Sequence, residues 1–237
     1  TTRTHNLPKD RGIFMKGFYK RFASLIFGLF LYSLGIAITM KANLGYAPWD
    51  VFHKGISNMT GITIGNASIL IGLIICVTVA LAGEKLGLGT ILNMILIGFF
   101  LDLILAVDKI PLMKGFLPGV AMMTIGLFVI SIATYFYLGS GFGAGPRDGL
   151  MVVLERRTGL PVGLCRAILE SMAVFLGWLM GGPVGLGTAF AAFGMGFCIQ
   201  ITFTLFRFRA TEVRHETIRE TLRISGSAID KGKNYAL

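Results

Sequence analysis

The chain has 237 residues, of which 54% are apolar and only 14% are charged, and it contains 32 glycines. A water-soluble protein of this size needs more charge to cover its surface, so the composition excludes an ordinary soluble domain; abundant glycine suits closely packed membrane helices. The net charge of +10 does not indicate a nucleic-acid partner, because Lys and Arg crowd the first 21 residues and the stretch after residue 206. Basic segments that flank apolar spans mark the cytoplasmic side of a membrane.

The apolar segments predict an all-α membrane protein with six transmembrane helices. A helix needs about 20 mostly apolar residues to cross the hydrocarbon core. The segments that meet this requirement are 22–40, 62–82, 89–107, 120–138, 160–180 and 187–206. Two further segments, 48–59 and 146–158, are predicted to be helical but are too short and too charged to span.

The halves of the chain form an internal repeat. Shifting the sequence by 98 positions aligns them without a gap, so that Gly28 meets Gly126 and Thr60 meets Thr158. Each half carries three spans, and two modules with an odd number of spans must lie in opposite orientations, as in many secondary transporters. If the two short helices also spanned the membrane, the repeats would be parallel instead. The predicted organisation is a basic cytoplasmic N-terminus (1–21), repeat 1 (22–107), a linker (108–119), repeat 2 (120–206) and a cytoplasmic C-terminal helix, 211–224, with its tail (207–237).

A Gly-x-x-Pro-x-Asp element opens both short helices. Gly allows unusual backbone angles before the helix, and Pro fits a first helical turn. Asp in that turn is favoured by the positive end of the helix. The element either stabilises helix starts or, if both short helices are re-entrant, brings two carboxylates to a shared central site. Its residues are Gly45, Pro48 and Asp50 in the first half and Gly143, Pro146 and Asp148 in the second.

Further polar residues complete a candidate site for a solute or ion. Arg166 and Glu170 are four residues apart on the fifth span, a spacing that places them on one helix face. Ionisable groups within a span often mark a transport pathway. If the fifth span starts later in the chain, both residues lie near the membrane interface instead. Trp49 and His53 occur only in the first half, and Arg147 stands at the position that matches Trp49. The two half-sites are therefore chemically unequal, as an asymmetric solute requires.

A resemblance to a known family rests on the first half. Residues 43–51, Asn-Leu-Gly-Tyr-Ala-Pro-Trp-Asp-Val, and residues 60–65, Thr-Gly-Ile-Thr-Ile-Gly, resemble the YczE/YitT-type bacterial membrane proteins. The second half departs from this pattern at Arg147 and Pro161. The resemblance implies a protein of the bacterial inner membrane and a transporter, but it indicates no substrate. The basic ends of the chain predict a multi-pass protein with both termini in the cytoplasm.

These features favour a small-solute transporter or exporter, coupled to protons or cations, in the lipid bilayer. The alternatives are a membrane-embedded solute-binding subunit of a larger transporter and a membrane adaptor or chaperone for a cytoplasmic enzyme. The sequence holds no catalytic set, no metal-ligand spacing and no phosphate-binding loop, so we expect neither an enzyme nor a cofactor or metal. Homo-oligomer formation stays open.

Overall fold

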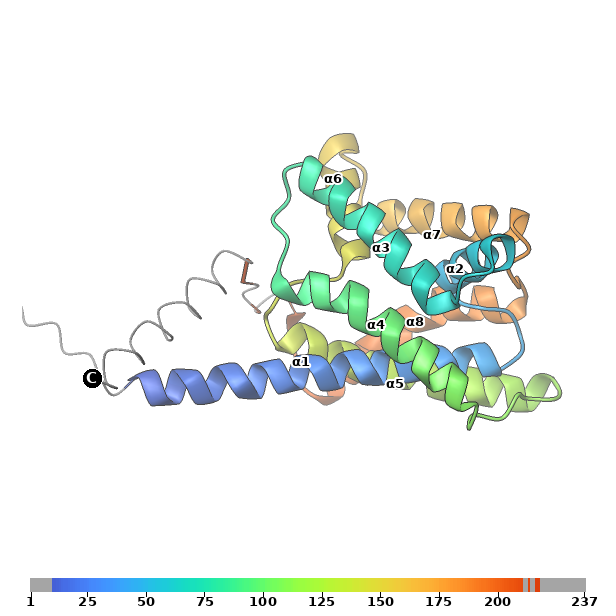
Figure 1. Ribbon diagram of the computed structural model, residues 1–237, viewed down its shortest axis with the longest axis horizontal. Coiled ribbons are helices and arrows are strands. Elements are labelled where there is room, and N and C mark those ends of the chain that lie inside the picture. The colour runs from blue at the N-terminus through green and yellow to red at the C-terminus, as the bar shows by residue number, and fades with distance from the viewer. Residues whose placement is uncertain (1–9, 211–212, 214–215, 218–237) are drawn as a thin grey trace, which may run out of the picture.

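Eight α-helices make up the described part of the chain (Figure 1). The structure, a computed structural model, describes residues 10–210, 213 and 216–217, and only the backbone of residues 10–16. The predicted C-terminal helix lies mostly outside these residues. The helices are α1 (Asp10–Lys41), α2 (Pro48–Thr60), α3 (Ile64–Leu81), α4 (Leu88–Val107), α5 (Phe116–Gly139), α6 (Pro146–Thr158), α7 (Val162–Leu179) and α8 (Leu186–Leu205).

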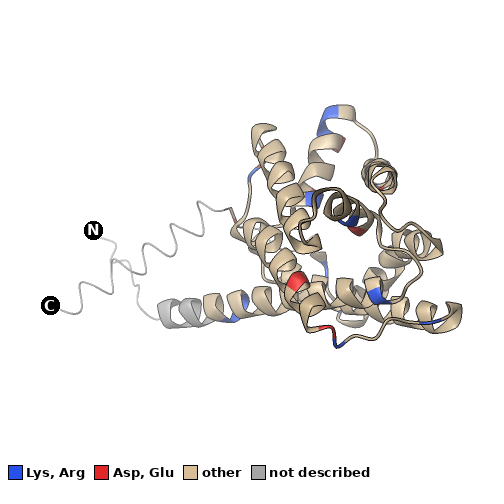
Figure 2. Cartoon of the chain, turned by 45° about the vertical axis from the view of Figure 1, so that its right-hand side comes forward, with Lys and Arg blue, Asp and Glu red and all other residues tan. Residues whose placement is uncertain are grey.

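The all-α fold with six spans is confirmed. Six helices are long and apolar enough to cross a membrane, namely α1 from Gly17 onward, α3, α4, α5, α7 and α8. Charged residues are sparse along these helices, although a few lie within the bundle (Figure 2). Spans can bury such groups only where other protein groups or water surround them, so the charges inside the bundle indicate an internal polar site.

The two short helices begin and end as the sequence predicts. Both α2 and α6 have 13 residues and carry Pro at the start of the helix. Both end at a glycine in the left-handed conformation, Gly61 with φ 77° and Gly159 with φ 70°. Because glycine reaches this conformation without steric cost, it can stop a helix after a few turns.

The long helices α1 and α5 lie side by side along the lower edge of the molecule in Figure 1. Small residues let their backbones approach closely. A Cβ at Gly28 would lie 3.1 Å from the carbonyl oxygen of Ala133, and a Cβ at Gly126 would lie 3.1 Å from that of Gly35. These contacts are reciprocal under the 98-residue shift, since Gly28 matches Gly126 and Gly35 matches Ala133.

The loops before the short helices exchange contacts in the same reciprocal way. The amide of Gly89 donates to the carbonyl of Phe142 at 2.7 Å, and the amide of Gly187 donates to the carbonyl of Leu44 at 2.7 Å. Such exchanged contacts are those that a two-fold relation between the repeats produces. The opposite orientation of the repeats in a membrane stays a prediction.

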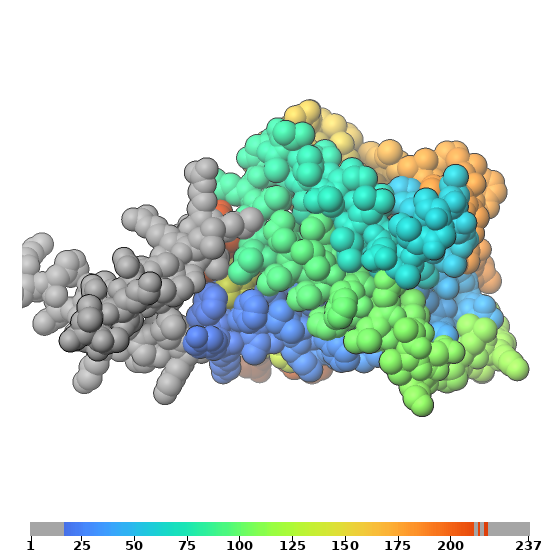
Figure 3. Space-filling view, viewed as in Figure 1, coloured from blue at the N-terminus to red at the C-terminus, as the bar shows by residue number. Residues whose placement is uncertain are grey.

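One pair of helices breaks this correspondence. The helices α3 and α4 pack together over the near face in Figure 3, with a Cβ at Gly98 falling 2.5 Å from the carbonyl oxygen of Gly65. At the matching positions on α7 and α8, a Cβ added to Gly163 or Gly196 would have no neighbouring atom within 4 Å. The second repeat therefore carries the glycines for a close crossing but holds the two helices apart.

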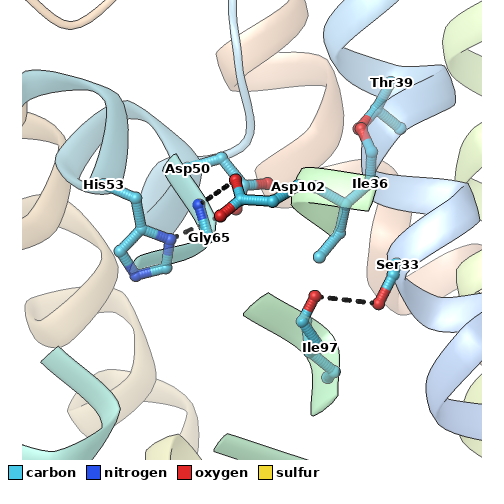
Figure 4. A network of polar contacts seen from close by, with 8 residues as sticks. All are labelled: Ser33, Ile36, Thr39, Asp50, His53, Gly65, Ile97 and Asp102. Carbon is cyan, nitrogen blue, oxygen red and sulfur yellow. Dashed lines mark hydrogen bonds and ion pairs between the residues drawn. The ribbon is translucent and has the colours of Figure 1, made fainter. Parts of the chain in front are cut away.

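Asp102 of α4 links α4 to the start of α3 by hydrogen bonds. Its carboxylate accepts a hydrogen bond from the Thr63 hydroxyl at 2.5 Å. It accepts another from the Gly65 amide at 2.8 Å (Figure 4). The matching residues in the second repeat are Gln200, Pro161 and Gly163, which cannot form the same pair of bonds. We call the α3–α4 pair and the α7–α8 pair the two outer walls of the bundle. These walls differ in the polar residues at the crossing as well as in the separation of their helices.

Candidate functional site

A cavity of about 140 Å³ lies where the starts of α2 and α6 meet. Side chains from α1, α5, α7 and α8 close its other sides. Its ionisable and aromatic lining residues are Tyr32, Trp49, Asp50, Arg147, Asp148, Arg166 and Glu170. Each half of the chain contributes to the site, as a cavity between two repeats requires.

Arg147 and Trp49 join the two helix starts directly. The guanidinium carbon of Arg147 lies 4.9 Å from the centre of the Trp49 ring, a cation–π contact. These residues occupy matching positions in the two repeats. If a two-fold axis relates the halves, residues meet their repeat mates close to that axis, and this contact is one such meeting.

Asp50 and His53 form a buried pair on α2. Asp50 is 4% exposed and His53 is 2% exposed. The side chains point toward one another (Figure 4), with Nδ1 of His53 3.6 Å from Oδ1 of Asp50, longer than an ordinary hydrogen bond. Neither atom has a hydrogen-bond partner among the described residues. Buried polar atoms without partners are costly, so this pair has the capacity to bind a proton or a small ion.

Asp148 plays a different part from Asp50 despite the repeated motif. Its carboxylate accepts a hydrogen bond from the Gly145 amide at 3.3 Å, at the start of α6. The start of α2 has no such side-chain cap. The helix-stabilising role thus has direct support at Asp148, whereas the carboxylate of Asp50 is turned toward His53.

Arg166 and Glu170 pair on α7, as their spacing predicts. Nε of Arg166 donates to Oε1 of Glu170 at 2.8 Å. The Arg166 side chain is half exposed and that of Glu170 is 19% exposed. In addition to the central cavity, Arg166 lines both of the side cavities described next.

Two side cavities flank the central one, and they correspond to each other. One, of about 360 Å³, lies beside α3 and α4 and includes Pro146, Ser68, Gly72 and Met94. The other, of about 670 Å³, lies between α7 and α8 and includes the four matching residues, Pro48, Arg166, Glu170 and Ala192. The second cavity is larger because α7 and α8 are apart.

The predicted residues fall close together but not all on one surface. Six of the seven candidate binding residues line the central cavity, while His53 and Pro146 line the side cavity beside α3 and α4. The first glycine of each motif lines none of these cavities and shapes the loop before its short helix. Gly45 and Gly143 have φ of 103° and 124°, and a Cβ on either would strike the loop before the other repeat's last span.

Sequence reasoning missed Tyr32, which lines both the central cavity and the cavity beside α3 and α4. Its only signal was a tyrosine inside an apolar span. Within the residues that the structure describes, no group of three or more His, Cys, Asp and Glu side chains is placed to hold a metal ion.

The fold and site define a polytopic membrane protein with an ionisable cavity between two similar halves. Residues 19–204 match a family described as a family of unknown function (DUF6198), and the chain belongs to this family. It is 33% identical to the uncharacterized membrane protein YczE of Bacillus subtilis strain 168 over 74% of this chain and 81% of that protein. It is 35% identical to an uncharacterized protein of Haemophilus influenzae over 77% and 83% of the two chains.

A third relative is the uncharacterized protein YyaS of Bacillus subtilis strain 168, which is 30% identical over 68% of this chain and 81% of its own. No solved structure matches the chain. The resemblance seen in the sequence motifs is therefore confirmed by similarity along most of the chain.

Proposed function

We propose that this protein is a secondary transporter whose substrate occupies the central cavity between two inverted repeats. The observation that carries the proposal is the meeting of Arg147 and Trp49, repeat mates at the starts of the two short helices. Broken helices that meet at the middle of the membrane form the substrate sites of many secondary transporters. The proposal places the protein in the bacterial inner membrane with both termini in the cytoplasm.

The charges around the cavity support coupling to a proton or cation. The lining holds three carboxylates, from Asp50, Asp148 and Glu170, and two guanidiniums, from Arg147 and Arg166. Carboxylates that share a poorly solvated site favour binding of a proton or cation. The unpartnered atoms of Asp50 and His53 are suited to accept that charge.

The paired side cavities support alternating access. The two are related by the repeat, yet the outer wall is closed at α3–α4 and open at α7–α8. If the repeats exchange conformations, the α3–α4 wall opens when the α7–α8 wall closes. The central cavity then faces the two sides of the membrane in turn.

A substrate-independent test is labelling of the cavity from each side of the membrane. Met151, which lines the central cavity, is replaced by Cys after the three native cysteines are removed. A charged, membrane-impermeant thiol reagent is added to right-side-out and to inside-out vesicles. We expect Met151→Cys to react from both sides, and the control Leu112→Cys in the exposed linker to react from one side only.

Reaction of Met151→Cys from one side only would contradict alternating access. It would favour the alternative in which the chain is a solute-binding subunit that delivers its ligand to a separate module.

A further inference from the structure

The cavity between α7 and α8 runs along the length of a span. Its α7 lining extends from Gly163 to Trp178, which at about 1.5 Å per residue is about 22 Å. That length exceeds half of the ~30 Å hydrocarbon core. A gap of this kind between two spans opens sideways to the lipid, so its natural occupant is a hydrocarbon chain rather than water.

The walls of this cavity are mostly apolar away from its inner end, where the polar lining residues are Arg166 and Glu170; Ser171 and Thr188 add two hydroxyl groups. Aromatic side chains, Phe175 and Trp178 on α7 and Phe193 on α8, stand at its exposed edges. Small residues, Ala167 and Ala189, leave the space between them. The apolar walls can hold a chain by burial of apolar surface alone.

The inner end of the cavity is polar. Pro48, Arg166, Glu170 and Ala192 line both this cavity and the central one. Nε of Arg166 donates to Glu170, but its Nη groups make no hydrogen bond to any residue that the structure describes. A guanidinium with free parallel donors at membrane depth matches a carboxylate in a two-bond arrangement.

We propose that the α7–α8 cavity binds a membrane-dissolved single-chain carboxylate, with its chain between α7 and α8 and its head on Arg166. It enters from the bilayer and reaches the central cavity past Arg166. An added carboxylate raises the negative charge of a site that already holds three carboxylates, so a proton or cation must enter with it. This inference rests on the proposed transport function for its biological role, and it makes the transported substrate a fatty-acid-like amphiphile.

The two tryptophans of the chain provide a direct test. Trp178 lines the α7–α8 cavity and Trp49 lines the central cavity. In a Trp49→Phe background, Trp178 fluorescence is followed in detergent while 9,10-dibromostearic acid is added in alkaline buffer. We expect saturable quenching that excess stearic acid reverses and excess methyl stearate does not, because the ester lacks the anionic head.

Variants separate a specific site from general exposure of Trp178. We expect Arg166→Gln to raise the half-saturating concentration at least tenfold. The double variant Arg166→Gln/Glu170→Gln, which leaves no unpaired carboxylate, should show the same loss. Ala189→Phe fills the cavity from α8 and should also weaken binding tenfold. Arg157→Gln, at the exposed end of α6, should stay within twofold of the parent.

Three results would overturn the proposal. Quenching that rises linearly and is equal for the methyl ester means that Trp178 merely faces detergent. Stronger quenching by a brominated diacyl phospholipid means that a membrane lipid fills the cavity. Absence of quenching means that the α7–α8 cavity is covered, for example by a second copy of the chain. Because binding is measured in detergent without transport, the result is independent of whether the reconstituted protein shows alternating access.

Discussion

Removal of the Asp102 carboxylate should destabilise the bundle because two donors lose their shared acceptor. Asp102 accepts hydrogen bonds from the Thr63 hydroxyl and the Gly65 amide, which tie α4 to the start of α3. Hydrogen bonds to a charged group contribute about 1.5–3 kcal/mol each, whereas interhelical bonds in membranes average about 0.6 kcal/mol. Asp102 is half-buried, so the expected value for its two bonds lies between the sums on these two scales. We therefore expect Asp102→Ala to lower the free energy of unfolding by about 2–4 kcal/mol.

The repeat supplies a matched control for this experiment. Gln200 stands at the corresponding position on α8 and is exposed, and the glycines around the matching crossing, Gly163 and Gly196, have no close neighbour. Gln200→Ala should therefore change stability by less than about 0.5 kcal/mol. The free energy of unfolding is measured by titration with a denaturing detergent in mixed micelles. Equal stability of the two variants would refute the idea that Asp102 fastens the α3–α4 wall.

The ionisable residues of the central cavity give two further predictions. Asp50→Asn should abolish coupled proton uptake by proteoliposomes without lowering the unfolding temperature, because the Asp50 side chain caps no helix. Asp148→Asn should also stop uptake, but it should lower the free energy of unfolding by up to about 1 kcal/mol because a helix cap is lost. Normal uptake by either folded variant would leave these residues as helix-start residues. In thermal unfolding, Glu170→Gln should be less stable than Arg166→Gln/Glu170→Gln, since the single change leaves a cation without its partner; two neutral single variants would show that the pair contributes nothing.

The helices were predictable because their signals are local. The six spans are read from apolar length alone, and the short helices from Pro48 and Pro146 at their starts and Gly61 and Gly159 at their ends. The convergence of the two helix starts followed from the repeat, since residues near the axis must meet their mates. The contact between Arg147 and Trp49 is such a meeting.

The differences between the halves were not predictable. Gly163 and Gly196 match Gly65 and Gly98, so the sequence gives no reason for α7 and α8 to separate. The role of Asp102 depends on how α3 crosses α4, which no local pattern specifies. In the same way, the repeated motif hides the contrast between a capping Asp148 and a buried Asp50, because each carboxylate turns toward what its own surroundings offer.

The central claim is that the two outer walls of the bundle open in turn, and paired spin labels test it most directly. Labels on Phe175 and Phe193 report the α7–α8 distance, and labels on their repeat mates Val77 and Ile95 report the α3–α4 distance; all four side chains are exposed. Double electron–electron resonance is recorded in lipid nanodiscs at several proton concentrations. The account predicts two distances for each pair, with the short α7–α8 population growing as the long α3–α4 population grows. A single unchanging distance for both pairs would contradict it.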